Sequence, residues 1–575
     1  MIFNLIVIVL VLLIAYMWTS QGLFSALIHL LCTIVAGAVA FAVWEPLAIG
    51  LLLGVHEGLA WSFALILPFL ATLGVLRVAC DKIIPANMEF DDITNFVGGG
   101  VFGLGAGVIS VGVLVISTSF MRIPSNFLGY SPVEVDSQGS VVRSSPMWLP
   151  ADMLTARFYE LMSMGSFSTS TPLALRQPDV HEQAAALRIT HDDSSRTTIL
   201  PEDFTILSRY TVLADNVRDL TSDSFNIGPD GNPRPQTVKL ISGDSPPAGS
   251  RIEGFVIRFG SGARESSGQI VIGPSQIRLV GRRGDEAVTM HPIAVVSRAA
   301  GDALAAGRFR FDAPNIFVPS VGGATEAIMA FEFVVPPDVE PLDIRVKNIR
   351  RAVSALPAAE EFNPAARDQS IRTLALLGQA GAAVENLDRS DVVTVPADIT
   401  FGSRNTRVIT TNTRLPQPIQ SGAVAGIQTN DDKEITRADS LIESRQMRHD
   451  IPRQLQITTF FTSTDTRLLM TNVSVESPLS LVGRVELNEP TPILIDDLGQ
   501  TYTPVGYMFT DNSDIRMYYD PGRPVSSMNQ LPTLTRTRPD QELRLIYRIS
   551  RNVNIVELAV GDRVIFQFSP PMRVN

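Results

Sequence analysis

The sequence predicts an α-helical membrane domain of four transmembrane helices, followed by two tandem all-β domains of the Ig-like sandwich type. Three observations predict this fold class. The chain is apolar and poor in charge up to Phe120, whereas from Met121 onward it is polar and rich in Arg, Asp, Ser, Thr and Pro. Glycine recurs every four residues in the last apolar segment. Similar segments recur within the polar part, which indicates an internal duplication.

Residues 2–18 are apolar except for Asn4. This segment is long enough to cross about 30 Å of hydrocarbon. Neither a basic leader nor a small-residue cleavage site accompanies this segment, so we expect it to be retained. The second crossing is predicted at residues 23–43 and contains His29. A polar side chain at membrane depth is a functional candidate, and the simpler alternative is a neutral imidazole that bonds to a neighbouring helix.

Residues 45–58 are predicted to form an apolar connector, re-entrant or interfacial in character. The third crossing is expected at residues 59–78, with a kink or interruption at Pro68, and it ends at Arg77. The fourth is expected from Asn95 to Phe120.

The fourth crossing carries Gly99, Gly103 and Gly107, which a helix would place on one face. Small residues let two helix backbones approach closely inside lipid, where the hydrophobic effect does not drive helices together. The glycine face is therefore predicted to be a helix-packing surface.

An even number of crossings places both chain ends on the same side of the membrane. The only basic residues of the short loops, Arg77 and Lys82, lie between the third and fourth crossings. The positive-inside rule assigns this loop to the cytoplasm. The polar part is therefore expected outside the cytoplasm, in an integral, multi-pass inner-membrane protein.

The first 122 residues resemble the CvpA family, the colicin V production proteins, which are four-helix inner-membrane proteins. The resemblance rests on Gln21-Gly22 before the second crossing and on Asn95 followed by the three spaced glycines. The chain departs from the family pattern at Asn95, where the family has Asp, and at Ala106, where it often has Arg. Some members carry a large extracytoplasmic domain after the fourth helix, so the resemblance implies an outside location for the polar part.

Residues 123–195 are predicted to form a juxtamembrane amphipathic helix and a linker. The helix is expected at residues 147–162, with Trp148, Phe158 and Leu161 on its apolar side. Two locations stay open for it, on the bilayer surface or against the next domain.

The polar part contains three pairs of similar segments in the same order. Residues 200–211 match 395–406 without a gap, residues 277–284 resemble 493–499, and residues 331–346 resemble 545–560. We therefore predict a first β-sandwich domain at 196–352, a helical linker at 353–391, and a second β-sandwich domain at 392–575.

Short runs rich in β-branched and aromatic residues support the β assignment. They lie at residues 251–259, 269–272, 455–461 and 466–470, and Gly, Pro, Ser or Asp bounds them. An Asp-rich turn ending at Gly499 predicts a hairpin between residues 493 and 502.

No nucleophile turn, metal-ligand spacing or phosphate-binding glycine loop is present in the sequence, so a non-enzymatic protein without cofactors or metals is predicted. The net charge of −11 argues against nucleic acid as a partner. The expected partners are the lipid bilayer and either a second copy of the chain or another envelope protein. The expected role is protein contact in envelope assembly, secretion or maintenance.

A second interpretation is a small transport or conduction unit with a regulatory extracytoplasmic domain. The polar residues His29, Arg77 and Asn95 would then line the path of the solute.

Overall fold

The described part of the chain comprises most of its residues. The computed structural model describes residues 2–84, 88, 90–122, 127–130, 133–135, 141–143, 147–168, 172–191, 195–212, 219–220, 236–237, 239–265, 268–298, 306–320, 323, 325–376, 387–402, 405–448, 450–462, 466–497 and 499–575.

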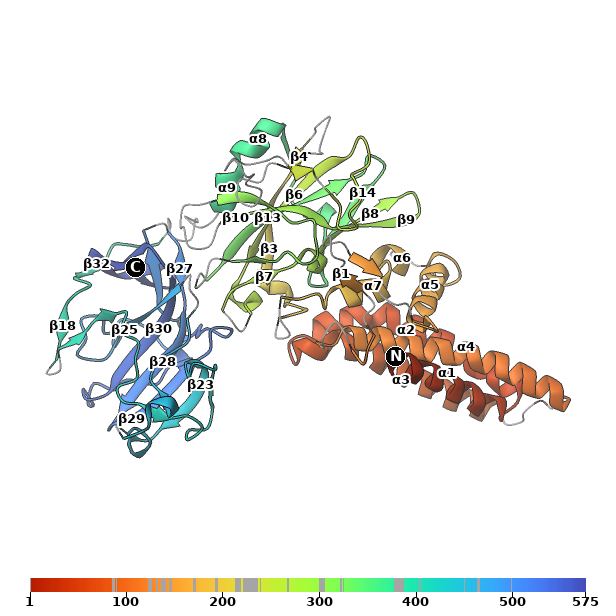
Figure 1. Ribbon diagram of the computed structural model, residues 1–575, viewed down its shortest axis with the longest axis horizontal. Coiled ribbons are helices and arrows are strands. Elements are labelled where there is room, and N and C mark those ends of the chain that lie inside the picture. The colour runs from red at the N-terminus through yellow and green to blue at the C-terminus, as the bar shows by residue number, and fades with distance from the viewer. Residues whose placement is uncertain are drawn as a thin grey trace.

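Four long helices form an elongated bundle, drawn in red and orange in Figure 1. They are α1 (Ile2–Thr19), α2 (Leu23–Leu47), α3 (Glu57–Ile83) and α4 (Asp92–Ser119). Each is long and apolar enough to cross a membrane. Large apolar side chains on all four helices remain exposed, among them Leu12, Leu31, Leu70 and Val101. This is the surface that a helix bundle offers to lipid.

The second and third helices differ from the expected segments. Helix α2 runs through Pro46 and continues as the π-helix η1 (Ala48–Leu52), so the expected connector begins as helix. Of the two alternatives expected at Pro68, the interruption is wrong, because α3 is one continuous helix around this residue, and the kink stays a prediction. Proline removes a single backbone hydrogen bond, and packed apolar helices tolerate that loss.

Three shorter helices connect the bundle to the first β region. They are α5 (Ala151–Met164), α6 (Leu173–Arg176) and α7 (Val180–Ala186). Helix α5 packs against α4, α6 and α7. A small hairpin of β1 (Val133–Val135) and β2 (Val141–Arg143) precedes α5.

The first β region (residues 195–376) contains a six-stranded sheet in the order β11-β10-β13-β6-β3-β16 and a four-stranded sheet in the order β15-β14-β8-β9. Two-stranded pairs β7–β12 and β4–β5 accompany them. The bounds are β3 (Phe204–Val212), β4 (Asp219–Leu220), β5 (Gln236–Thr237), β6 (Arg251–Phe259), β7 (Val271–Ile272), β8 (Ile277–Arg283), β9 (Glu286–Met290), β10 (Pro292–Arg298), β11 (Ala306–Arg310), β12 (Val318–Pro319), β13 (Ala327–Val335), β14 (Glu340–Val346), β15 (Ile349–Ala352), β16 (Glu360–Phe362), α8 (Pro364–Gln369), α9 (Ile371–Leu376), and the 3-10 turns η2 (Pro201–Asp203), η3 (Ser261–Ala263), η4 (Pro274–Gln276) and η5 (Val353–Ala355).

The second β region (residues 387–575) contains a seven-stranded sheet in the order β20-β25-β30-β28-β29-β23-β22 and a five-stranded sheet in the order β17-β32-β31-β26-β27. Pairs β18–β19 and β21–β24 complete it. The bounds are β17 (Val393–Val395), β18 (Thr400–Phe401), β19 (Thr406–Arg407), β20 (Ile409–Thr410), β21 (Ile419–Gln420), β22 (Ile427–Thr429), β23 (Ile435–Ile442), β24 (Gln456–Ile457), β25 (Thr466–Asn472), β26 (Ile493–Asp496), β27 (Thr501–Tyr502), β28 (Pro504–Asp511), β29 (Asp514–Tyr519), β30 (Glu542–Ser550), β31 (Val553–Val560), β32 (Arg563–Val574), and the 3-10 turns η6 (Ser444–Gln446), η7 (Arg453–Leu455) and η8 (Met528–Gln530).

The two β regions share a strand order. In the larger sheets, β3-β6-β13-β10-β11 has its counterpart in β20-β25-β30-β28-β29, and in the smaller sheets β15-β14-β8-β9 has its counterpart in β32-β31-β26-β27. The hairpins β8–β9 and β26–β27 both turn at a glycine with positive φ, Gly284 and Gly499. Such a backbone conformation favours glycine over other residues.

The ungapped match between residues 200–211 and 395–406 does not agree with this strand order. In the first region Arg209 of β3 lies opposite Phe255 of β6, and in the second region Ile409 of β20 lies opposite Thr471 of β25, so the strand order pairs Arg209 with Ile409. The match would instead pair Arg209 with Arg404. The hairpin β18–β19 occupies the intervening residues and displaces β20 along the chain.

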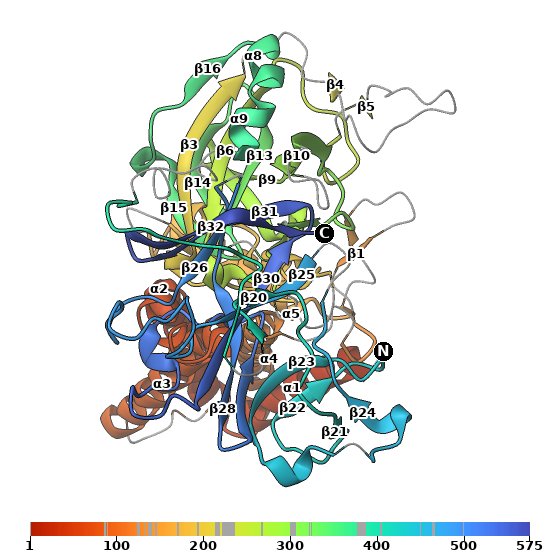
Figure 2. The ribbon, with the colours of Figure 1, turned by 90° about the vertical axis from the view of Figure 1, so that its left-hand side faces the viewer.

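Several expected elements of the polar part are present. The strand predicted at 251–259 is β6, and the hairpin predicted between 493 and 502 is β26–β27. Of the strand expected at 455–461, only residues 456–457 belong to a strand, β24. Within the expected linker, β16 extends the six-stranded sheet and α9 packs on β10, β11 and β13 (Figure 2), while residues 377–386 lie outside the described part.

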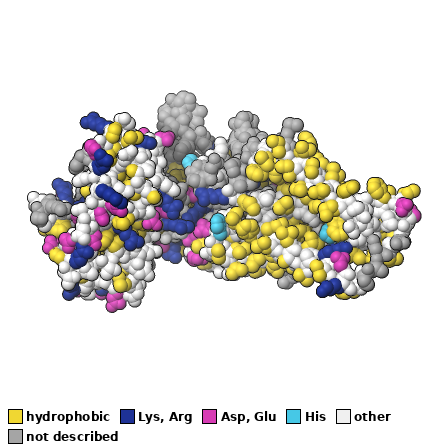
Figure 3. Space-filling model, turned by 90° about the horizontal axis from the view of Figure 1, so that it is seen from below, with side chains coloured by type: hydrophobic (Ala, Val, Ile, Leu, Met, Phe, Trp, Pro, Cys, Tyr) yellow, Lys and Arg dark blue, Asp and Glu magenta, His cyan; other side chains and the backbone are white. Residues whose placement is uncertain are grey.

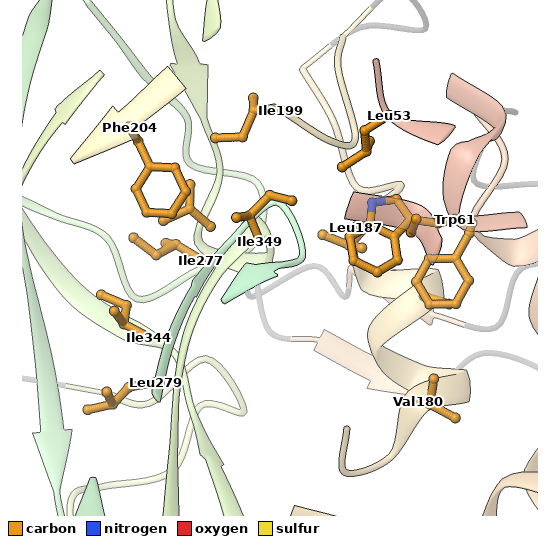
Figure 4. Close-up of a cluster of buried hydrophobic side chains, with 14 of the residues drawn as sticks. Leu53, Trp61, Val180, Leu187, Ile199, Phe204, Ile277, Leu279, Ile344 and Ile349 are labelled. Carbon is orange, nitrogen blue, oxygen red and sulfur yellow. The ribbon is translucent and has the colours of Figure 1, made fainter. Parts of the chain in front are cut away.

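One apolar core joins the helix bundle to the first β region. Leu53 and Trp61 from the bundle belong to the same buried cluster as Leu187, Ile199 and Phe204. Figure 4 shows these side chains on the two sides of the junction. The second β region has buried clusters of its own, with members from both of its large sheets. The first β region therefore packs on the end of the bundle as a continuation of its core.

Candidate functional site

The predicted glycine face of α4 lies against α1. A Cβ atom added at Gly103 would lie 2.9 Å from the carbonyl oxygen of Ala15 and 3.0 Å from its Cα. At Gly107 it would lie 2.9 Å from the carbonyl oxygen of Val11, and at Gly99 it would lie 3.1 Å from the Cα of Thr19. All three neighbours are backbone atoms of α1, so the two helices approach at a distance that leaves no room for a side chain.

A second line of glycines on α4 was not singled out by the sequence analysis. Gly98 and Gly105 face Leu23 and Leu30 of α2, and Gly112 faces Thr155 of α5. A spacing of seven residues marks this line, and it could have been found by testing heptad as well as four-residue spacing. Helix α4 is thus the central helix, with glycine contacts to three neighbours.

Two of the intramembrane polar candidates meet at Trp18. The ring of His29 stacks on the Trp18 ring at 3.9 Å between centroids, and the guanidinium of Arg77 lies 4.9 Å from the Trp18 ring centroid. Arg77 also donates to the side chain of Ser25 at 2.9 Å and pairs with Asp81 at 2.8 Å. Trp18 carried no signal of this role in the sequence.

The sequence suggested that His29 forms a hydrogen bond to a neighbouring helix. Its Nδ1 atom does not form this bond, because it has no hydrogen-bond partner among the described residues. His29 is nevertheless buried. The Trp18 ring stacks on the imidazole of this buried histidine.

Asn95, the third candidate, ties the start of α4 to the start of α2. Its side-chain oxygen accepts a hydrogen bond from the backbone N–H of Leu23 at 3.3 Å, and its amide donates to the carbonyl of Phe90 at 2.8 Å. These bonds satisfy backbone groups at helix ends, which is a structural role.

The free thiols of Cys32 and Cys80 lie 3.7 Å apart between α2 and α3.

Helix α5 turns a largely polar and small-residue face toward the bundle. The Tyr159 hydroxyl lies 3.1 Å from the carbonyl oxygen of Ile34, next to Gly37, and the Thr155 hydroxyl donates to the carbonyl of Val108 at 3.2 Å. The opposite face exposes Leu161 to 73% and Leu154 to 44%. A surface helix of a soluble protein turns its apolar face inward and its polar face outward, whereas α5 has the opposite arrangement.

Glu160 lies on the buried face of α5 and accepts a hydrogen bond from the backbone N–H of Asp179 at 2.7 Å. Burial, together with the nearby Asp179 carboxylate, raises the pKa of Glu160 to about 7.

Polar contacts accompany the apolar core at the junction of the bundle with the first β region. The Trp61 indole donates to the Thr198 hydroxyl at 3.0 Å. The buried carboxylate of Glu45 pairs with Arg176 at 2.8 Å and with Arg350 at 3.1 Å. A buried carboxylate requires such partners, because an unpaired buried charge is costly.

Catalytic and metal chemistry was not expected from the sequence. Across the described ranges, no group of three or more His, Cys, Asp or Glu side chains is arranged to hold a metal ion. His291 is buried with its Nδ1 atom 3.1 Å from the carbonyl oxygen of Pro274, and burial lowers its pKa to about 4. His449, another histidine of the polar part, lies outside the described residues.

A scan against protein-family models, a search of curated proteins and a search of solved structures find no match for this chain. The resemblance to the CvpA family therefore rests only on the residues quoted for it in the first 122 positions.

Proposed function

We propose that the chain is a CvpA-like, multi-pass inner-membrane protein that presents its β regions outside the cytoplasm for protein contacts in envelope assembly, secretion or maintenance. The observation that carries this proposal is the shared core of the bundle and the first β region, reinforced by the buried Glu45 ion pairs. An anchor that continues into the β region holds it at a defined place above the membrane. That arrangement suits a scaffold for partner proteins.

We also infer that the two β regions are copies of one Ig-like sandwich domain. The shared order of their strands supports this, as do the two glycine turns at equivalent hairpins. The displaced β20 is explained by an insertion in the second copy. Duplicated sandwiches offer two related surfaces for protein contacts.

Leu441 on β23 and Leu487 are suitable probe positions for a partner contact, because both are about 60% exposed on the second β region. A photo-crosslinking amino acid at either position in the full-length, membrane-inserted protein should give one discrete adduct with an envelope protein or a second copy. Asp432, in an exposed polar turn, is the control position and should give none.

The transport interpretation predicts a different result. Absence of adducts at Leu441 and Leu487, together with solute flux in liposomes that His29→Ala abolishes, would replace the scaffold proposal with a conduction unit.

A further inference from the structure

A cleft of about 640 Å³ lies where the end of the bundle meets both β regions. Its walls come from the turn between η1 and α3, the residues after α4, the segment before β3, and the second β region. Four arginines line it, namely Arg122, Arg196, Arg437 and Arg523. Figure 3 shows Lys and Arg side chains gathered beside the apolar surface of the helices.

Acidic side chains neutralise only part of this charge. Arg196 pairs with Glu57 at 3.6 Å, and Arg437 pairs with Asp520 at 2.9 Å. In the described part of the chain, neither Arg122 nor Arg523 forms an ion pair with a carboxylate, and both are exposed. Two guanidinium groups are therefore available for an anion. Their planar donor geometry matches phosphate oxygens.

The same cleft has an apolar side. Val55, Leu59 and Met121 line it, and Val55 is 80% exposed. Leu51 of η1 lies four residues before Val55 and is 60% exposed. The cleft thus adjoins the apolar surface of the bundle. A ligand with both an anionic group and hydrocarbon chains would contact both sides, whereas free phosphate would leave the apolar side unused.

The level of the cleft relative to the bilayer agrees with such a ligand. The helical segment Leu23–Leu52 has 30 residues, which corresponds to about 45 Å of helix. A bilayer with its headgroup layers is about 40–45 Å thick. A bundle that begins at one membrane surface near Leu23 therefore reaches the opposite headgroup layer near Leu52, next to the cleft.

We propose that this cleft binds the phosphate of an acidic phospholipid headgroup, with Arg122 and Arg523 as its main ligands and Val55 and Met121 against the acyl chains. Because Arg122 follows α4 and Arg523 belongs to the second β region, the bound lipid would link these two parts of the protein. The inference depends on membrane insertion of the bundle, but not on the proposed protein contacts.

The test uses the full-length protein purified in detergent and measures its thermal unfolding with added lipid. Phosphatidylglycerol should raise the Tm of the parent by several degrees, because a ligand that binds only the folded state stabilises it. Phosphatidylcholine, whose headgroup has no net charge, and inorganic phosphate should raise it much less. The double variant Arg122→Gln, Arg523→Gln should lose most of the shift with phosphatidylglycerol.

The matched control is Arg573→Gln, an exposed arginine on β32 that does not line the cleft. It should keep the parental shift. The single variant Arg523→Gln should show a reduced shift even if the double variant cannot be purified. Equal shifts with phosphatidylcholine, a full shift with inorganic phosphate alone, or a parental shift in the Arg523→Gln variant would each overturn the proposal.

Discussion

Replacement of Gly103 by Leu should separate α1 from α4 and destabilise the bundle by about 1–3 kcal/mol, the typical cost of inserting extra atoms into a well-packed core. Already the first added atom would lie 3.0 Å or less from backbone atoms of Ala15. Backbone atoms cannot move aside as a flexible side chain can, so the helices must part and lose their close contacts. The expected readouts are a lower Tm in detergent and a lower abundance in the membrane.

The matched control makes the same substitution at Gly74 of α3, where an added Cβ atom meets no other atom within 4 Å. Gly74→Leu should leave Tm near or above that of the parent, since leucine favours helix more than glycine does. Leu104→Ile should also be tolerated, because Leu104 is partly exposed beside the glycine face. Equal stability of the Gly103→Leu and Gly74→Leu variants would show that α1 and α4 do not pack through the glycines.

Replacement of Glu332 by Gln should destabilise the first β region by about 3–5 kcal/mol, the cost of breaking a buried ion pair. Glu332 on β13 is fully buried, contacts Arg308 and Arg367, and accepts a hydrogen bond from the Tyr210 hydroxyl at 3.0 Å. Glutamine has the same shape but no charge, so Arg367 would lose its charged partner, and Arg308 would keep only its pair with Asp368. Thermal unfolding followed by β-sheet circular dichroism measures the effect.

The control is Glu326→Gln, next to the start of β13, where the pair with Arg258 is 3.9 Å long and largely solvent-exposed. Such pairs contribute about 1 kcal/mol at most. Similar losses in both variants would contradict the role assigned to the buried network.

The Glu332 prediction includes a pH dependence. Burial by itself would raise the pKa of Glu332, but Arg367 and Arg308 outweigh it and lower the pKa to about 2. A carboxyl group with a lowered pKa in the folded state stabilises the fold at pH above its unfolded value of 4.5, and this stabilisation is lost as the pH falls toward 2. The difference in Tm between the parent and Glu332→Gln should therefore narrow between pH 5 and about 2.

The apolar helices could be predicted from the sequence because uninterrupted hydrophobic runs of this length have few alternatives. The residues at which these helices end could not be predicted from the sequence. Glu45 suggested a connector, because the sequence does not show that Arg176 and Arg350, far away along the chain, neutralise it. The orientation of α5 was also hidden, since its packing depends on Gly37 and Gly112 in two other helices.

The β assignment followed from local composition, and the shared strand order of the two regions agrees with the sequence similarity at residues 277–284 and 331–346. The sequence match between residues 200–211 and 395–406 does not agree with the strand order. The β18–β19 hairpin lies before the first strand of the second region, and the sequence does not show that it is an insertion. Among the polar candidates, His29 and Arg77 come together only through Trp18, an aromatic residue with an ordinary place in an apolar run.

We propose that the bundle crosses the membrane with both β regions on the outer side and the α3–α4 loop in the cytoplasm. Cysteine labelling in intact cells tests it most directly, in a full-length chain whose Cys32 and Cys80 are replaced by Ala and which carries one new cysteine, Met88→Cys in the loop or Asp432→Cys in the second β region. A membrane-impermeant maleimide should label the Asp432→Cys variant in intact cells and the Met88→Cys variant only after permeabilisation. Labelling of Met88→Cys in intact cells, with Asp432→Cys protected, would contradict the account.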